Sequence, residues 1–449
     1  MLDNNIDRIA DKLLRLSKEH GADGYEAYVA ETKKLSISTG DKKSIENLQA
    51  DEEHAVAVRT LKEQRLGFSF SFELSDIAVE ETFKRALDSG TIMDKQRFLF
   101  PENKPDMLAP EAFYDRHIET VSGEDKLETV TSMVDAAHVD KRIIKVERPS
   151  YEEAAVSVVV INSSGVLKKS RATRFGISLS VLAREGKESQ MSWDFQGANT
   201  FSRLKPDRVA RNCSEQALQT LGGIQLLTGL YDTMFTQLVV SQFLSVLSKS
   251  FLADSVFKRT SLLADKLDQQ IFPEHINILD DPTLQDGHGS VPFDAEGTPA
   301  VKKIVVAKGT VKSFLCDRYY AALMDTETSG NAVRHSITSP PSIGTTNLVL
   351  DTDKPVSGDL KLELSDGPVI TELMGLHTVN PVTGDFSLGA RGYMIKSGRF
   401  SSPLKGITIA GNLFTMFNSI HKAGTDHVLY GHIRTPSVII KGLKIAGAR

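Results

Sequence analysis

The first half of the chain carries one order of predicted elements twice, helix, strands, helix, and this repetition constrains the fold more than any other feature. The first copy begins with an amphipathic helix that ends at Gly21. Strand-like runs follow at residues 25–38, 53–61 and 65–72. Ser75 is placed to cap a second helix that runs to about Asp88. We therefore predict an α+β domain over residues 1–100.

The second copy follows a proline-rich stretch. Three prolines between residues 101 and 110 interrupt the pattern, so we predict a linker over residues 101–121. Ser122 is placed to cap the next helix, and a helix that begins at Pro206 closes a middle domain over residues 122–225. The strands between these helices are predicted at 154–162, 166–169, 173–184 and 188–193. The shared order suggests two related α+β units, which a duplication would explain.

The remaining chain, residues 226–449, has a different pattern. Many short β-like runs are separated by glycine turns, which predicts a β-rich C-terminal domain with a curved sheet or partial barrel. These runs are 304–307, 311–314, 348–350, 360–364, 369–373, 392–395, 406–410 and 437–441. Helices at 237–252 and 413–420 are expected to pack against that sheet.

The composition disfavours several classes of protein. The net charge is −5 and no long Lys/Arg cluster occurs, so a direct nucleic-acid partner is disfavoured. The most apolar stretch, 237–252, is shorter than the ~20 apolar residues that a bilayer requires, which indicates a core helix and no membrane span. The first residues lack the features of a secretory signal, and the widely separated Cys213 and Cys316 suit a reducing compartment. We expect a cytoplasmic protein.

Searches for catalytic motifs fail. The sequence has no G-x-S-x-G, no G-x-G-x-x-G, no G-x-x-x-x-G-K-[ST] and no cysteine pairs for a zinc ribbon. Eleven histidines occur, but no two stand four residues apart, the spacing of helical zinc sites. The region of Asp426, His427 and His432 indicates a polar loop, because a five-residue spacing suits neither a helix face nor a strand face.

A cluster of four aspartates and one histidine leaves two interpretations open. It consists of Asp280, Asp281, Asp286, His288 and Asp294. Their oxygen atoms could hold a hard cation. Neighbouring proline and glycine residues instead mark turns, where Asp side chains bond their own backbone, and we favour this second interpretation.

The C-terminal third carries the most informative motifs. They read I-T-E-L-M-G at 370–375, P-V-T-G-D-F-S-L-G-A-R-G-Y at 381–393 and P-L-K-G-I-T-I-A-G-N-L at 403–413, with P-F-D-A-E-G-T-P upstream at 292–299. In this order the motifs closely resemble the PmbA/TldE branch of the TldD/PmbA family. The resemblance covers essentially the whole chain.

The resemblance implies a peptidase system divided between two chains. In the family, TldD-type chains carry His-Glu-x-x-x-His on the helix that opens the third domain, and a cysteine near the C-terminus is a further metal ligand. They pair with TldE-type chains to degrade or mature unfolded peptides, and an older description is modulator of DNA gyrase. Here the matching helix, residues 235–243, has neither His nor Glu, and residues 431–437 have no Cys. The resemblance therefore implies no catalytic residue, metal ligand or cofactor in this chain, with zinc and general base in a TldD-type partner.

The same motifs supply candidates for a substrate path. They are Glu372, Gly375, His377, Gly384, Gly389, Gly392, Gly411 and Asn412. Glycines allow positive φ or close approach of another backbone, so an extended peptide could add beside them through main-chain bonds. The alternative for each glycine is that it simply ends a strand.

Two hypotheses of function stay open at this point. The first is a TldE-like subunit of a heterodimeric, cytosolic metallopeptidase that acts on unfolded peptides. The alternative is a non-enzymatic binding or scaffold protein, alone or as a homodimer. The missing metal ligands argue against an autonomous metalloenzyme, but they do not separate these two hypotheses.

Overall fold

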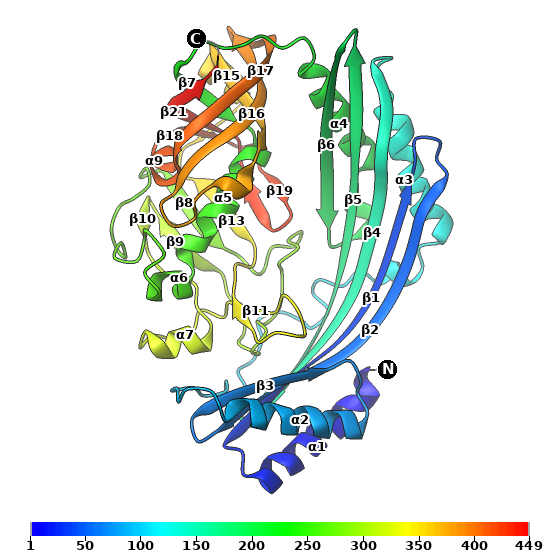
Figure 1. Ribbon diagram of the computed structural model, residues 1–449, viewed down its shortest axis with the longest axis vertical. Coiled ribbons are helices and arrows are strands. Elements are labelled where there is room, and N and C mark those ends of the chain that lie inside the picture. The colour runs from blue at the N-terminus through cyan, green and yellow to red at the C-terminus, as the bar shows by residue number, and fades with distance from the viewer. Residues whose placement is uncertain (1, 448–449) are drawn as a thin grey trace.

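The computed structural model describes residues 2–447, and one bent six-stranded sheet runs through the first half of this chain (Figure 1). Its strand order is β3-β2-β1-β4-β5-β6. The strands are β1 (Gly24–Thr39), β2 (Ile45–Lys62), β3 (Arg65–Ser71), β4 (Ile143–Asn162), β5 (Leu167–Glu185) and β6 (Glu188–Ala198). The helices are α1 (Leu2–His20), α2 (Asp76–Gly90), α3 (Gly123–Ala137) and α4 (Pro206–Gln219).

The two predicted copies share this sheet. β1 and β4 pair antiparallel at its centre, from Glu26 opposite Asn162 to Ser38 opposite Ser150. The order of strands outward from this pair is the same in both halves, as a duplicated unit requires. The mixed α+β class and the two helix–strands–helix units are therefore confirmed.

Local capping explains where the second helix of the first copy and the first helix of the second copy begin. The side chain of Ser75 accepts a hydrogen bond from the backbone N of Ala78. Ser122 and Asp125 form a reciprocal capping box at the start of α3. Both predicted caps are confirmed.

The sheet is covered by helices on one side only. Successive side chains of a strand face opposite sides. On one side, Ala27 and Val29 are buried in a core with α1 and α2, and Ile177 in a core with α3 and α4. The other side, which carries Tyr28 and Arg174, faces the C-terminal domain (Figure 1).

The C-terminal domain contains two larger sheets. The first has the order β10-β9-β8-β13-β20-β19, with β8 (Ile276–Asp280), β9 (Lys303–Ala307), β10 (Thr310–Val311), β13 (Leu348–Thr352), β19 (Val428–Tyr430) and β20 (Ile433–Thr435). The second has the order β14-β18-β21-β17-β16-β15-β7, with β7 (Gly229–Phe235), β14 (Pro355–Val356), β15 (Gly367–Met374), β16 (Asp385–Lys396), β17 (Arg399–Asn412), β18 (Ile420–Gly424) and β21 (Val438–Ala446). A small ribbon joins β11 (Ala332–Val333) to β12 (Ser342–Ile343).

The second sheet closes on itself, because β7 pairs with both β15 and β21. The predicted curved sheet or partial barrel is thus confirmed. The domain also holds α5 (Gln237–Ser248), α6 (Ala253–Phe257), α7 (Arg318–Leu323), α8 (Leu360–Leu364) and α9 (Leu413–Asn418). α5 lies in the apolar core, where the ring of Phe243 stacks on Phe235 with centroids 5.7 Å apart.

Four predicted strands of the sequence need correction. Residues 360–364 form the short helix α8, and of 311–314 only Val311 lies in a strand. Residues 166–169 and 173–184 are not separate strands, because β5 runs through both without a break. Ladder pairing with β4 continues across residues 170–172, so the chain stays extended between the two predicted strands.

The proline-rich stretch lies against the sheet. Arg171 N donates to Pro110 O at 2.9 Å, and Thr173 N donates to Phe113 O at 3.0 Å. The division into domains 1–100, 122–225 and 226–449 with a linker at 101–121 stays our proposal. Among the described residues, no helix is long and apolar enough to cross a membrane.

Candidate functional site

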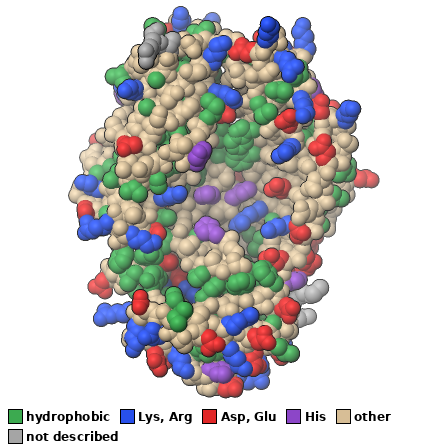
Figure 2. Space-filling view, in the orientation of Figure 1, with side chains coloured by type: hydrophobic (Ala, Val, Ile, Leu, Met, Phe, Trp, Pro, Cys, Tyr) green, Lys and Arg blue, Asp and Glu red, His purple; other side chains and the backbone are tan. Residues whose placement is uncertain are grey.

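A hollow separates the uncovered face of the long sheet from the C-terminal domain, and we call it the chamber. Figure 2 shows histidine and basic side chains gathered inside it. One cavity of about 490 Å³ belongs to it. It is lined by Lys34, Leu35, Ser36, Gln49, Asp51, Glu152, Glu153, Ala154, Arg174, Phe175, Gly176 and His288. All but the last belong to the sheet, so the chamber is formed between two parts of the chain that are distant in sequence.

Small polar side chains line a neighbouring cavity of about 400 Å³. Ser150 and Ser178 are hydrogen-bonded there through their hydroxyl oxygens at 2.8 Å. Trp193 also lines this cavity, and its ring stacks on Phe195 at 5.4 Å. Phe195 in turn contacts Tyr430 of the C-terminal domain at 5.6 Å. The sheet thus offers a wall of serines with an aromatic edge, which suits an extended chain with little sequence preference.

The C-terminal domain closes the chamber along β6. A Cβ atom at Gly197 would meet the His288 ring at 2.2 Å, so this imidazole lies directly against the strand. Burial, with the charges of Arg174 and His432, lowers the pKa of His288 to about 4. Further along β6, Arg391 Nη1 donates to Met191 O at 2.8 Å. These contacts fix the width of the chamber.

A buried ion network, which we call the seam network, holds the two parts together at the other end. Arg59 of β2 contacts Glu26 of β1 at 2.7 Å and Glu296 of the C-terminal domain at 2.9 Å. All three side chains are almost fully buried. Burial, reinforced by the negative charge of Glu296, raises the pKa of nearby Asp294 to about 7. A buried charge without a partner of opposite sign is strongly destabilising. The network therefore favours the one arrangement of the two parts in which all its charges are paired.

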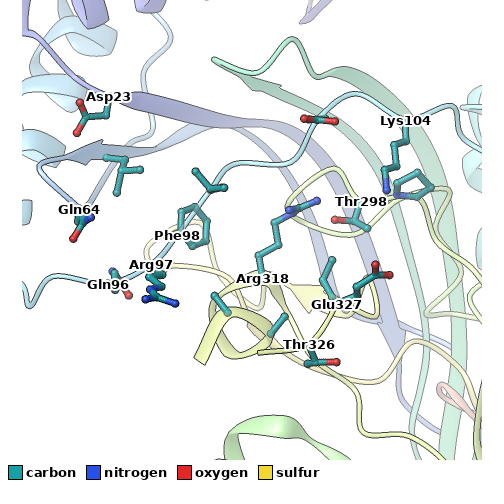
Figure 3. Close-up of a pocket in the computed structure, with 17 residues that line it drawn as sticks. Asp23, Gln64, Gln96, Arg97, Phe98, Lys104, Thr298, Arg318, Thr326 and Glu327 are labelled. Atoms are coloured by element: carbon teal, nitrogen blue, oxygen red, sulfur yellow. The ribbon is translucent and has the colours of Figure 1, made fainter. Parts of the chain in front are cut away.

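A third cavity, the seam cleft of about 770 Å³, opens beside this network (Figure 3). Arg318 points its guanidinium toward Thr298, and Nε of Arg318 and Oγ1 of Thr298 are buried without a hydrogen-bond partner among the described residues. The charged lining consists of Arg97, Lys104, Arg318, Asp23, Glu102 and Glu327. The lining contains three basic and three acidic side chains, so its net charge favours neither an anionic nor a cationic ligand.

The two places where the resemblance puts metal ligands lie side by side. Thr435 Oγ1, on β20, donates to the backbone O of Gln237 at the start of α5, at 2.9 Å. Gln237 Nε2 donates to Asp426 Oδ2 at 2.6 Å, and Ser437 Oγ donates to the same oxygen at 2.8 Å. A catalytic zinc needs three protein ligands. This junction offers one carboxylate, that of Asp426, which already accepts hydrogen bonds from Gln237 and Ser437, so the donor set at the junction does not fit a catalytic zinc.

Two aspartates of the acidic cluster bond the backbone of their own turns. Asp281 Oδ1 accepts from Thr283 N at 2.9 Å, and Asp294 Oδ1 accepts from Glu296 N at 3.0 Å. Asp286 pairs with Arg203. The turn interpretation therefore holds for Asp281 and Asp294, whereas Asp280 lies on β8 and accepts from Thr346 N and from Asn331 Nδ2.

The predicted path residues are spread over the closed sheet. Glu372 Oε2 accepts from Arg391 Nη1 at 3.2 Å, and burial raises the pKa of Glu372 against the effect of that arginine. Gly389 lies on β16 beside β15. Gly375, with φ of 82°, turns the chain into a short 3-10 turn that carries the exposed His377.

Two further candidates shape one loop. Asn412 caps α9 by accepting from Phe414 N at 3.1 Å, and its Nδ2 donates to Thr383 O at 2.7 Å. Gly384 adopts φ of 79° directly against Asn412, where a Cβ would come within 3.2 Å of Nδ2. Both residues thus have a structural role in this loop.

The last two glycines sit in strands. A Cβ at Gly411 would meet the ring of Phe386 at 3.3 Å. At Gly392 it would lie 1.9 Å from Val369 O, where the register of β15 and β16 shifts. None of these contacts involves a peptide, so the substrate path over the eight candidates stays a prediction.

Sequence reasoning missed the residues of the chamber wall. Arg174, Gly176 and Ser178 alternate on β5 with buried Phe175 and Ile177. This alternation indicates a strand with one buried face. What the pattern lacked was any sign that the polar face would lie opposite a second domain.

Comparison with known protein families matches three consecutive parts of the chain. The family models PmbA/TldA metallopeptidase domain 1, central domain and C-terminal domain match residues 25–90, 116–221 and 228–447. The chain therefore belongs to the PmbA/TldD metallopeptidase family. Within that family it is of the PmbA/TldE type.

Individual relatives are similar to this chain over nearly its whole length. Metalloprotease PmbA of Escherichia coli O157:H7 is 28% identical over 95% of this chain and 93% of that protein. A Thermotoga maritima structure described as a modulator of a DNA gyrase has a TM-score of 0.89, with 24% identity over 99% of this chain and 100% of the other. TldE from Thermococcus kodakarensis has a TM-score of 0.88, with 20% identity over 98% and 100%. At these identities the two structures support the fold.

Proposed function

We propose that this chain is the TldE-like subunit of a TldD/TldE-type cytosolic metallopeptidase that degrades or matures unfolded peptides. In this division of labour the chain supplies structure and a substrate path, and a TldD-type partner supplies zinc and the general base. The observation that carries the proposal is the junction of α5 and β20. Gln237, Thr435 and Ser437 stand there and bond to one another or to Asp426, in place of metal ligands.

The chamber supports the second part of the proposal. It lies between the long sheet and the C-terminal domain, and serines form much of the wall beside β5. A peptide bound mainly through its backbone needs such a wall more than it needs specific pockets. The E. coli relative is named a metalloprotease, and the similarity covers 95% of this chain and 93% of that protein.

Co-expression with a TldD-type protein of the same genome tests the proposal. We expect a stable complex that binds zinc and cleaves an unfolded peptide faster than the partner alone. The control is a partner whose His-Glu-x-x-x-His glutamate is replaced by glutamine, which should keep the complex and lose cleavage.

Two outcomes would contradict the proposal. If the chains do not associate, or if cleavage by the partner is unchanged, the subunit role fails. A stable homodimer that binds peptides without any such partner would instead favour the alternative, a non-enzymatic binding or scaffold protein.

A further inference from the structure

The outer edge of β2 is unpaired over most of its length. Residues 56–62 of β2 pair with β3, but among the described residues the stretch 45–55 pairs only with β1, on its other side. Residues 45–53 are all exposed, so the C-terminal domain does not cover them. Figure 1 shows β2 at the rim of the sheet, on the far side from β6. We call residues 45–55 the free edge.

The pairing pattern determines which backbone groups of the free edge point outward. Lys62 and Arg65 flank a two-residue turn whose central residues have φ of 51° and 64°. Residues that flank such a turn exchange both backbone hydrogen bonds, so Lys62 directs its N–H and C=O toward β3. This direction alternates along a strand, and the register of β2 with β1 has no bulge between residues 47 and 61. The residues that direct N–H and C=O away from β1 therefore include Leu48, Ala50 and Glu52.

The hairpin that carries the free edge is held at both ends. Near its tip, the side chain of Lys43 donates to Asp135 of α3 at 2.6 Å, and Asp41 Oδ1 accepts from Val146 N of β4 at 3.1 Å. At the other end, the ladder with β3 fixes β2. The free edge thus presents a row of N–H and C=O groups in a fixed geometry, which lowers the entropy cost of adding a strand.

The side chains of the free edge continue both faces of the sheet. Asn47 and Gln49 line the two cavities of the chamber side. On the helix side, Leu48 stands opposite Ile37 of β1, which is buried in the core with α3 and α4. Leu48 itself is 60% exposed. A peptide in the chamber would leave Leu48 in water, whereas a folded protein that continues both faces of the sheet would bury it.

The charge of the free edge argues against a second copy of this chain. The edge has no lysine or arginine, and its acidic residues are Glu46, Asp51, Glu52 and Glu53. Lys33 contacts Glu52 at 3.3 Å and Lys34 stands opposite Asp51, but both lysines lie on β1, inside the edge. Two free edges paired with each other would place acidic residues on adjacent strands, which is destabilising. A strand with basic residues fits this edge better.

We propose that the TldD-type partner docks on the free edge, where one of its strands, carrying basic residues, pairs with residues 45–55 and joins the two sheets into one. The inference rests on the proposed function and names the docking surface for its partner. The C-terminal domain closes the chamber along β6, through Arg391 and His288. A partner on the opposite edge of the sheet would extend the chamber toward its own zinc, so one peptide could contact both chains.

Hydrogen exchange of single amides, measured on the full chain with and without the co-expressed partner, tests this docking surface. In the chain alone, the outward amides of Leu48, Ala50 and Glu52 should exchange rapidly. The amides of Gln49 and Asp51 bond to β1 and should exchange more slowly, which gives an internal control. Binding of the TldD-type partner should slow the three outward amides about tenfold or more.

Ala50→Pro removes one outward N–H and leaves the bonds to β1 in place, and sheets tolerate proline at such edge positions. It should raise the Kd of the complex about tenfold without changing the thermal unfolding of the chain alone. Ala50→Val keeps the N–H and is the control at the same position, so its Kd should be unchanged. Glu46→Lys should also weaken the complex, because it would repel the basic strand.

The outcomes that overturn the inference can be told apart. A complex that forms without slowing the outward amides, or that Ala50→Pro and Ala50→Val affect alike, places the partner elsewhere and leaves the proposed function standing. Concentration-dependent slowing in the chain alone assigns the free edge to a second copy. Slowing by an unfolded peptide without the partner assigns it to the substrate. Absence of any complex contradicts the proposed function itself, and the inference with it.

Discussion

Arg59 is the residue on which docking of the two parts of the chain depends most. Replacing it by Met leaves the buried carboxylates of Glu26 and Glu296 without a cation. Breaking a buried ion pair from one side costs about 3–5 kcal/mol, so Arg59→Met should lower the free energy of unfolding by that amount. Urea denaturation measures the loss. Arg171→Gln, in a half-exposed network, should lose less than about 1 kcal/mol, and equal losses would contradict the role of the seam network.

Asp317 gives the seam network a dependence on pH. Burial, with the negative charge of Glu296, raises its pKa to about 6 in the folded chain, above the ordinary 3.8. The folded state therefore holds this proton more tightly than the unfolded state. The resulting stability is complete below about pH 4 and is lost as the pH rises through 6.

Asp317→Asn tests this dependence. The amide keeps the acceptor that caps α7, where Asp317 Oδ1 receives a hydrogen bond from Tyr320 N at 2.9 Å. Between pH 4 and 7 the variant should therefore lose less stability than the unaltered chain, by up to about 3 kcal/mol. Urea denaturation across this range measures it. Parallel curves for the two proteins would show that Asp317 does not titrate in this way.

At the scale of strands, alanine substitution at two glycines tests whether Gly392 has a structural role or a role in the substrate path. Gly392→Ala would force a Cβ to 1.9 Å from Val369 O at the bulge between β15 and β16, so we expect a loss of about 2 kcal/mol or more. Gly176→Ala meets nothing within 4 Å and should stay within about 0.5 kcal/mol. Thermal unfolding of both variants measures this. Lost peptide cleavage in Gly392→Ala with unchanged unfolding would instead favour a role in the substrate path.

Helices and strands could be predicted where the apolar residues fit either the helical or the strand spacing, but not where they fit both. The sequence L-K-L-E-L at 360–364 alternates, which predicts a strand. However, the side chain of Asp359 accepts from Lys361 N at 3.0 Å and caps a helix. Leu360 and Leu364, one turn apart, are buried, while Leu362 is 65% exposed. Five residues satisfy both patterns, so the tertiary contacts decide between them.

For the whole molecule, the family resemblance named the two segments that meet at α5 and β20, but the sequence predicted neither their contact nor the chamber. The junction depends on two segments that the family resemblance names. The chamber depends on long-range docking, which brings His288 against Gly197 and Arg334 over Tyr28. No periodicity within one strand encodes which surface will lie opposite it, so the sequence did not indicate that the polar face of β5 lines a cavity.

If peptides pass through the chamber, filling it should block them without unfolding the protein. Gly176 is the position for this test, because it lines the cavity beside Arg174 and a Cβ there meets open space. Gly176→Phe should keep the partner complex and lower kcat/KM for an unfolded peptide about tenfold or more. Gly176→Ala serves as the control at the same position, and Gly123→Phe, outside the chamber at the start of α3, as the control for bulk. Unchanged kcat/KM in Gly176→Phe would place the substrate path elsewhere.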